Sequence, residues 1–116
     1  MAERIVVSDK LGAAGLEVLR GIAGYEVTDV AGKGPEALDA TLPEAVALVV
    51  RSETKVTAAM IAKAPRLKVI GRAGMGVDTI DVDAASAKKI AVLTAPGANS
   101  NSVAEYTFAL LLALCR

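Results

Sequence analysis

Short apolar runs alternate with segments of helical periodicity along the whole chain. The runs at residues 4–8, 25–30, 46–50, 67–71 and 90–94 have the length and β-branched content of strands. Between them, apolar positions at helical spacing predict helices over residues 12–23, 35–42, 56–63 and 82–89, and a last helix from about Ser102 to the end. Pro35 stands in the first turn of the second helix, where its missing N–H costs nothing, and Thr57 is a candidate N-cap of the third.

Five strand–helix units in succession predict an α/β fold with a doubly wound parallel sheet. We expect a flavodoxin-like sheet of five strands in the order 2-1-3-4-5, with helices on both faces. In such sheets ligands bind beyond the carboxyl ends of the strands, where the strand order reverses. For this chain, that point lies between the first and third strands.

Polar residues follow the predicted strands at this edge. Asp9 and Lys10 follow the first strand, Arg51 and Ser52 the third, and Arg72 the fourth. Because neighbouring strands lie about 4.8 Å apart, we expect the two arginines to leave the sheet side by side and to share an anion. The alternative is that each arginine pairs with a local carboxylate, for which the candidates are Glu53, Asp78 and Asp81.

A glycine loop follows the fourth strand at residues 71–78. Its exposed amides at Gly74, Met75, Gly76 and Val77, beside an arginine, suggest a receptor for a carboxylate or phosphate. The glycine spacing is G-x-x-G-x-G, the reverse of the dinucleotide fingerprint G-x-G-x-x-G, and acids follow it. The loop is therefore not predicted to cradle a pyrophosphate, and an ordinary tight turn remains the alternative.

Other uses of this fold fit the same edge less well. A phospho-accepting receiver domain needs an Asp after the third strand and a Lys after the fifth, where this chain has Arg51 and Thr94. A flavin module needs a hydroxyl-rich first loop and aromatic rings, which are also missing. Asp9 and Lys10 are interpreted as surface residues of a loop, and residues 54–55 as a solvated turn.

Composition narrows the function further. Thirteen basic and 13 acidic residues give a net charge of zero, so neither a nucleic-acid nor a membrane partner is expected. The single cysteine allows no internal disulfide, and no leader or membrane-spanning stretch is recognised, so we expect a cytoplasmic protein. The chain has no histidine, which removes the commonest general acid–base and the commonest metal ligand, and no metal site is predicted.

The predicted last helix is apolar nearly all round. Ser102 and Glu105 have the spacing of a capping box, and residues 108–115 follow with no polar face. Such a helix needs protein on both sides. We expect the sheet on one side and a second domain on the other. The alternative is a hydrophobic interface in a homo-oligomer.

Three motifs together resemble the D-isomer-specific 2-hydroxyacid dehydrogenases. Residues 67–81, LKVIGRAGMGVDTID, are similar to the family signature, and residues 49–57 and 96–105 resemble its upstream motif and its entry into a linking helix. The resemblance covers the whole chain. It implies that residues 1–101 are the N-terminal part of a flavodoxin-like substrate-binding domain, and that residues 102–116 lead toward a missing Rossmann domain that binds NAD.

The resemblance also implies roles for individual residues toward a small anionic 2-hydroxy acid. Arg51 and Ser52 would touch its polar end, with Arg72 nearby and Asn99 at the cleft. The amides around Gly74, Met75, Gly76 and Val77 would hold its carboxylate, and Met75 and Val103 would face the nicotinamide. Met75 and Thr79 depart from the residues common in the family.

The residues that perform the family's chemistry are expected outside this segment. The catalytic arginine, glutamate and histidine and the G-x-G-x-x-G of the family come later in its members' chains. No catalytic residue is therefore predicted here, and the isolated segment is expected to be inactive. A stand-alone module that binds anions or dimerises is the alternative.

Overall fold

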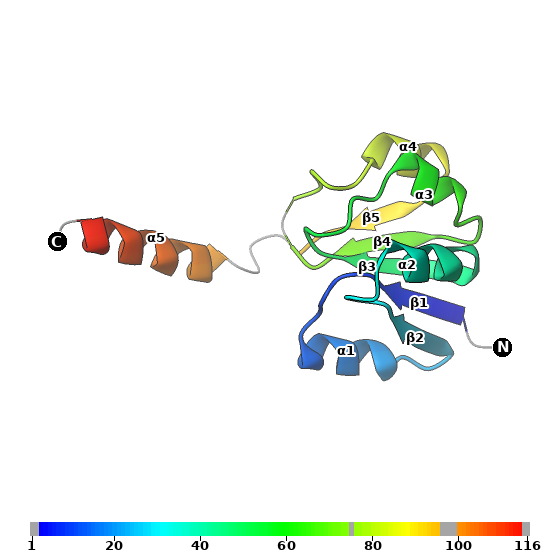
Figure 1. The fold of residues 1–116 in the computed structure, drawn as a ribbon, viewed down its shortest axis with the longest axis horizontal. Helices are drawn as coiled ribbons and strands as arrows, with labels where there is room; N and C mark the ends of the chain where they lie inside the picture. Colours follow the sequence, from blue (N-terminus) through cyan, green and yellow to red (C-terminus); the bar gives the residue numbers. More distant parts are fainter. Residues whose placement is uncertain (1–2, 75, 96–99, 115–116) are drawn as a thin grey trace.

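The computed structural model describes residues 3–74, 76–95 and 100–114, and shows a five-stranded parallel sheet with flanking helices (Figure 1). The strand order is β2-β1-β3-β4-β5, which confirms the predicted fold. The strands are β1 (Glu3–Val7), β2 (Tyr25–Asp29), β3 (Ala45–Val50), β4 (Val69–Arg72) and β5 (Ala91–Leu93). Because β1 lies between β2 and β3, the strand order reverses there, as predicted.

The helices begin and end at local signals in the sequence. They are α1 (Ala13–Arg20), α2 (Pro35–Thr41), the short 3-10 helix η1 (Leu42–Glu44), α3 (Ala58–Ala62), α4 (Val82–Ala87) and α5 (Ser100–Leu114). The Thr57 hydroxyl accepts the N–H of Met60 at 3.3 Å, which confirms the predicted N-cap of α3. Asp81 caps α4 by accepting the N–H of Ala84 at 3.0 Å. Helix α1 ends at Arg20 and not at residue 23, and the N–H of its C-cap residue, Gly21, donates to the carbonyl oxygens of Glu17 and Leu19.

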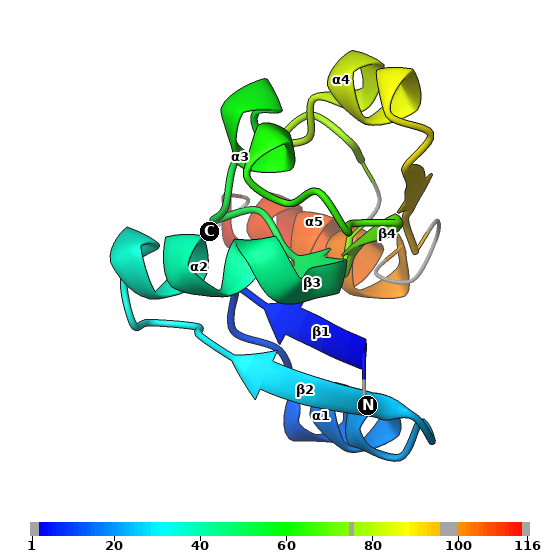
Figure 2. The same cartoon turned by 90° about the vertical axis from the view of Figure 1, so that its right-hand side faces the viewer.

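The hydrophobic core lies on one face of the sheet. The register places Val6, Leu48 and Ile70 in one row across β1, β3 and β4, and all three are almost fully buried. Residues of α2, η1, α3 and α4 complete this core, whereas α1 contributes no buried residue. Right-handed crossovers put α1 on the opposite face from the other three helices, and Figure 2 shows it beside β2, away from α3 and α4.

Helix α5 does not cover the sheet. In Figure 1 it lies apart from the other elements, and Tyr106, Phe108 and Leu112 are about two-thirds exposed, at 67%, 67% and 69%. The expectation that the sheet covers one side of this helix is therefore wrong for this structure. The helix also begins at Ser100, so Ser102 lies inside its first turn and not at the N-cap of a capping box.

Candidate functional site

A buried carboxylate fixes the loop that follows β3. Asp9, only 3% exposed, comes two residues after β1. Its Oδ2 accepts the backbone N–H groups of Arg51 at 2.7 Å and Thr54 at 3.0 Å, and its Oδ1 accepts the Thr54 hydroxyl. The interpretation of Asp9 as a surface residue is wrong, and so is that of Thr54 as part of a solvated turn. Asp9 follows β1 and accepts N–H groups of the loop that follows the neighbouring strand β3. It thus acts on this loop as an N-cap side chain acts on a helix.

The side chain of Arg51 lies over the end of β1. Its Nη1 donates to the carbonyl oxygen of Lys10 at 3.1 Å, and both Arg51 and Ser52 are exposed. Asp9 thus sets the backbone of Arg51, while Lys10 orients its guanidinium. The remaining guanidinium donors of Arg51 have no partner among the described residues, so they are available to an anion.

Arg72, the last residue of β4, is held by its own loop. Its Nη1 donates to Asp78 Oδ1 and, at 3.0 Å, to the carbonyl oxygen of Gly76. The Arg72 side chain is 11% exposed, whereas that of Asp78 is 78% exposed. The hydrogen bond from Arg72, with its charge, lowers the pKa of Asp78 below the ordinary value of 3.8. For Arg72 the structure therefore shows a carboxylate partner, the alternative that the sequence left open.

The glycines of this loop make room for the Arg72 side chain. A Cβ at Gly74 would stand 3.3 Å from Arg72 Nε, and one at Gly76 would stand 3.1 Å from Asp78 Oδ1. Close approach of side chains, and not the left-handed φ found at Gly24, Gly32 and Gly34, explains glycine at position 74. The Gly74 carbonyl also accepts the N–H of Ala95 at 2.8 Å, which joins the loop to the end of β5.

The predicted site residues lie on adjacent strand ends, but the two arginines have different partners. Arg72 is paired in register with Val50, so Arg51 lies one position further along, just beyond the end of β3. Val77 and Gly76 are exposed in the loop after β4. Met75 and Asn99 lie outside the described residues, and Val103 lies in the first turn of α5. A shared anion site for these groups stays a prediction.

The sequence did not predict the lining residues of a hollow that lies at the reversal point of the sheet. It has a volume of about 520 Å³ and is lined by the ends of β1 and β2, by α2, by the loop after β3 and by α3. Its lining residues are Ser8, Val30, Gly32, Gly34, Pro35, Leu38, Asp39, Glu53, Thr54, Lys55 and Met60. The predicted strand order indicated only that a ligand site would lie between β1 and β3. Its walls come from residues far apart in the sequence, which no local motif connects.

The described part of the chain offers neither a metal site nor a membrane span. Across residues 3–74, 76–95 and 100–114, no cluster of three or more acidic or cysteine side chains is placed to hold a metal ion. Within the same ranges, no helix has both the length and the apolar character that crossing a membrane requires.

Comparison with known proteins gives consistent matches over almost the whole chain. Residues 5–114 match the family model described as "D-isomer specific 2-hydroxyacid dehydrogenase, catalytic domain". The chain is 49% identical over 113 residues to a D-3-phosphoglycerate dehydrogenase of Methanocaldococcus jannaschii, and 41% identical over 113 residues to that of Sus scrofa. In both cases the match covers 97% of this chain and 21% of the relative, so the chain spans about a fifth of the length of these curated relatives.

Solved structures agree with the sequence relatives. A protein of Thermus thermophilus, TT0316, superposes with a TM-score of 0.88 at 36% identity, covering 97% of this chain and 37% of that one. An NAD⁺-bound 3-phosphoglycerate dehydrogenase of Entamoeba histolytica gives a TM-score of 0.84 at 32% identity, covering 96% and 38%.

Proposed function

The chain belongs to the family of D-isomer-specific 2-hydroxyacid dehydrogenases, and from this premise we propose that it is the substrate-binding segment of an NAD-dependent D-3-phosphoglycerate dehydrogenase. The reaction proposed for the complete protein is the oxidation of D-3-phosphoglycerate to 3-phosphohydroxypyruvate, which feeds serine biosynthesis. The observation that carries the proposal is the 41–49% identity, over 97% of this chain, to proteins named D-3-phosphoglycerate dehydrogenase.

The geometry of the strand ends supports a binding role. Asp9 fixes the loop that carries Arg51 and Ser52, and the guanidinium donors of Arg51 other than the one bound to Lys10 have no partner among the described residues. A planar guanidinium can bind a carboxylate or phosphate through two parallel hydrogen bonds. We assign Arg51 and Ser52 to the polar end of the substrate, and the amides after Gly74 to its carboxylate. Arg72, already paired with Asp78, shapes that loop and adds positive charge near it.

The residues of this chain do not fit a complete NAD site. The 116 residues contain no G-x-G-x-x-G, and the loop after β4 has the reverse spacing. NAD would accept the hydride in the complete protein, and its main binding site is proposed to lie outside residues 1–116. Of this chain, Met75 and Val103 are assigned to the nicotinamide side of the cleft. The cytoplasm is the proposed location.

The test is an assay of the complete protein, followed by the absorbance of NADH. D-3-phosphoglycerate with NAD should give turnover, whereas D-glycerate and D-lactate should be poorer substrates because they lack the phosphate. Turnover of D-lactate at an equal or higher kcat/KM would contradict the proposed substrate but not the family. The 116-residue chain alone should give no NADH. Measurable turnover by it would contradict its assignment as a binding segment.

A second function, self-association, is favoured by the exposed apolar surface of α5. Six large side chains of this helix are about half to four-fifths exposed, from 49% at Leu110 to 83% at Leu114. A continuous apolar surface of this kind marks an interaction site in most proteins. We assign it to a homo-oligomer contact of the 116-residue chain. Light scattering should show a dimer or larger species that Leu112→Glu dissociates. A monomer at high concentration would refute the assignment.

A further inference from the structure

The hollow at the reversal point of the sheet is a separate site from the predicted substrate loop. Its volume of about 520 Å³ falls in the range of roughly 300–1,000 Å³ typical of small-molecule pockets. None of the described residues assigned to the substrate lines it. It lies between β1 and β3, the place where sheets of this topology bind ligands.

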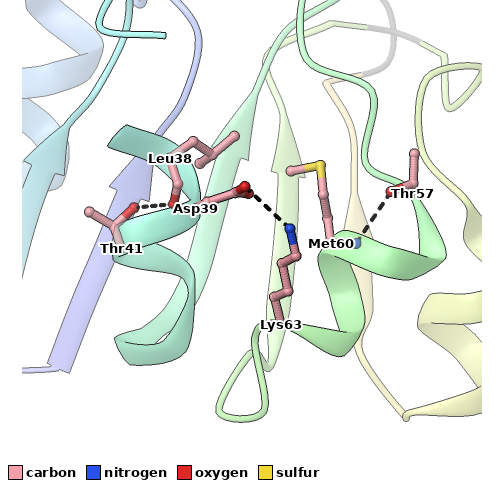
Figure 3. A network of polar contacts seen from close by, with 6 residues as sticks. All are labelled: Leu38, Asp39, Thr41, Thr57, Met60 and Lys63. Carbon is pink, nitrogen blue, oxygen red and sulfur yellow. Dashed lines mark hydrogen bonds and ion pairs between the residues drawn. The ribbon is translucent and has the colours of Figure 1, made fainter. Parts of the chain in front are cut away.

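Helices α2 and α3 give the pocket an apolar part of its wall. Figure 3 shows Leu38 of α2 and Met60 of α3 pointing toward one another across the pocket, and Val30 adds a third apolar side chain. The Lys63 ammonium donates to Asp39 Oδ2 at 3.2 Å and so joins the two helices (Figure 3). This ion pair neutralises Asp39, the only acid of α2 that lines the pocket in the described part of the chain.

The loop after β3 adds one charge of each sign to the pocket lining, at Glu53 and Lys55. Glu53 and Lys55 flank Thr54, whose backbone N–H and hydroxyl are both bound to buried Asp9. Both charged side chains are exposed, and within the described ranges neither makes an ion pair or side-chain hydrogen bond. Asp9 therefore holds the loop at Thr54, while the charges of Glu53 and Lys55 remain available to a ligand.

We propose that this pocket binds the zwitterion of an α-amino acid with an aliphatic side chain. The ammonium group would meet Glu53, the carboxylate would meet Lys55, and the side chain would lie between Leu38 and Met60. The Glu53 carboxylate would repel a simple anion, and the Lys55 ammonium would repel a simple cation, so each would bind with lower affinity than a ligand that carries both charges. A zwitterion gains from both charges. The absence of aromatic side chains from the lining fits an aliphatic ligand of moderate size.

The test is an NMR titration of the 116-residue chain with L-leucine as the probe. Saturable shifts should appear at residues that line the pocket. Three analogues each remove one feature: 4-methylpentanoate lacks the ammonium, isopentylamine lacks the carboxylate, and glycine lacks the side chain. Each should bind about tenfold more weakly than L-leucine, as expected for the loss of one charge-assisted contact or of the apolar contact.

Two variants assign the charges, and a third is the matched control. Lys55→Gln should weaken the binding of L-leucine and 4-methylpentanoate and strengthen that of isopentylamine, because it removes a charge that repels the cation. Glu53→Gln should weaken the binding of L-leucine and isopentylamine and strengthen that of 4-methylpentanoate. Lys10 lines a neighbouring hollow of about 460 Å³ that shares Glu53 and Gly32 but is not part of this pocket. Lys10→Gln should therefore bind L-leucine as the parent chain does. Circular dichroism confirms that each variant is folded.

Three results would overturn the proposal: no saturable shifts with L-leucine, equal affinity for L-leucine and 4-methylpentanoate, or an equal loss in the Lys10 and Lys55 variants. The second result would identify a plain carboxylate site instead. None of these results bears on NADH formation by the complete protein, so failure here leaves the proposed function unaffected.

Discussion

Replacing Asp9 with alanine should cost this chain a large part of its stability. The substitution removes the acceptor of three hydrogen bonds, from the N–H of Arg51, the N–H of Thr54 and the Thr54 hydroxyl. Hydrogen bonds to a charged group contribute roughly 1.5–3 kcal/mol each, but water can reach part of this loop once the carboxylate is gone. We therefore expect the free energy of unfolding to fall by about 3 kcal/mol in total.

Asp9→Asn separates the hydrogen bonds from the charge. The amide oxygen can still accept the two backbone N–H groups, and the Thr54 hydroxyl can rotate to accept the amide N–H. A loss of about 1 kcal/mol is expected for this variant. Glu17→Ala is the control, because Glu17 is exposed on α1 and has no side-chain partner among the described residues.

Equilibrium unfolding in urea, with thermal scans beside it, measures these differences. A stability of about 5–15 kcal/mol is usual for a domain, so a loss of about 3 kcal/mol should be obvious. At roughly 4 °C per kcal/mol, the alanine variant should melt about 12 °C lower. A change below about 0.5 kcal/mol in the alanine variant would refute the reasoning, because it would mean that the buried carboxylate stabilises nothing.

Three further predictions follow from the site and its loops. In the complete protein, Arg51→Ala should weaken substrate binding by about 2 kcal/mol through loss of a charge-assisted contact, and an unchanged KM would remove Arg51 from the site. Because the pKa of Asp78 is lowered in the folded chain, its pair with Arg72 stabilises the fold above the ordinary pKa of 3.8 and loses that effect as the pH falls through the lowered value. Asp78→Asn should abolish this part of the acid dependence of unfolding, and an unaltered pH profile would contradict the pair. Gly34→Ala should destabilise by about 1 kcal/mol in urea unfolding because φ is +89° there, whereas Gly21→Ala, with φ −78°, should be neutral or stabilising, so equal effects would argue against backbone strain.

The sequence predicted the sheet well because its signal is local. Each buried strand is a short apolar run, and the predicted cap at Thr57 needs only a residue three positions away. The strand order followed from connection rules that apply to any such alternation. The family, too, was identified from contiguous motifs, and the match over residues 5–114 confirms it.

The features that the sequence missed depend on residues distant in the chain. Asp9 is separated by 42 and 45 positions from the two residues whose N–H groups it accepts, and backbone N–H groups carry no sequence signal. The only hint is an acid placed directly after the strand at which the order reverses. The pocket between α2 and α3 has the same character, because its lining comes from separate loops and helices. Helix α5 was expected to pack on the sheet because its sequence is apolar nearly all round. An apolar sequence indicates that a helix is covered, but it does not say which element covers it.

The anchoring of the β3 loop by Asp9 bears on the order in which the molecule is assembled. Every group in this anchor belongs to residues 9–54, whereas the residues on either side of the loop also bond to later segments, Val50 to Ala73 and Val56 to Thr79. During translation, β1 can pair with β3 only after β3 has been synthesised, and the Asp9 carboxylate can accept the N–H groups of the loop when the two strands pair. Pairing of β1 with β3 thus brings Asp9 to the N–H groups of Arg51 and Thr54, while β4 supports the same loop from its other side.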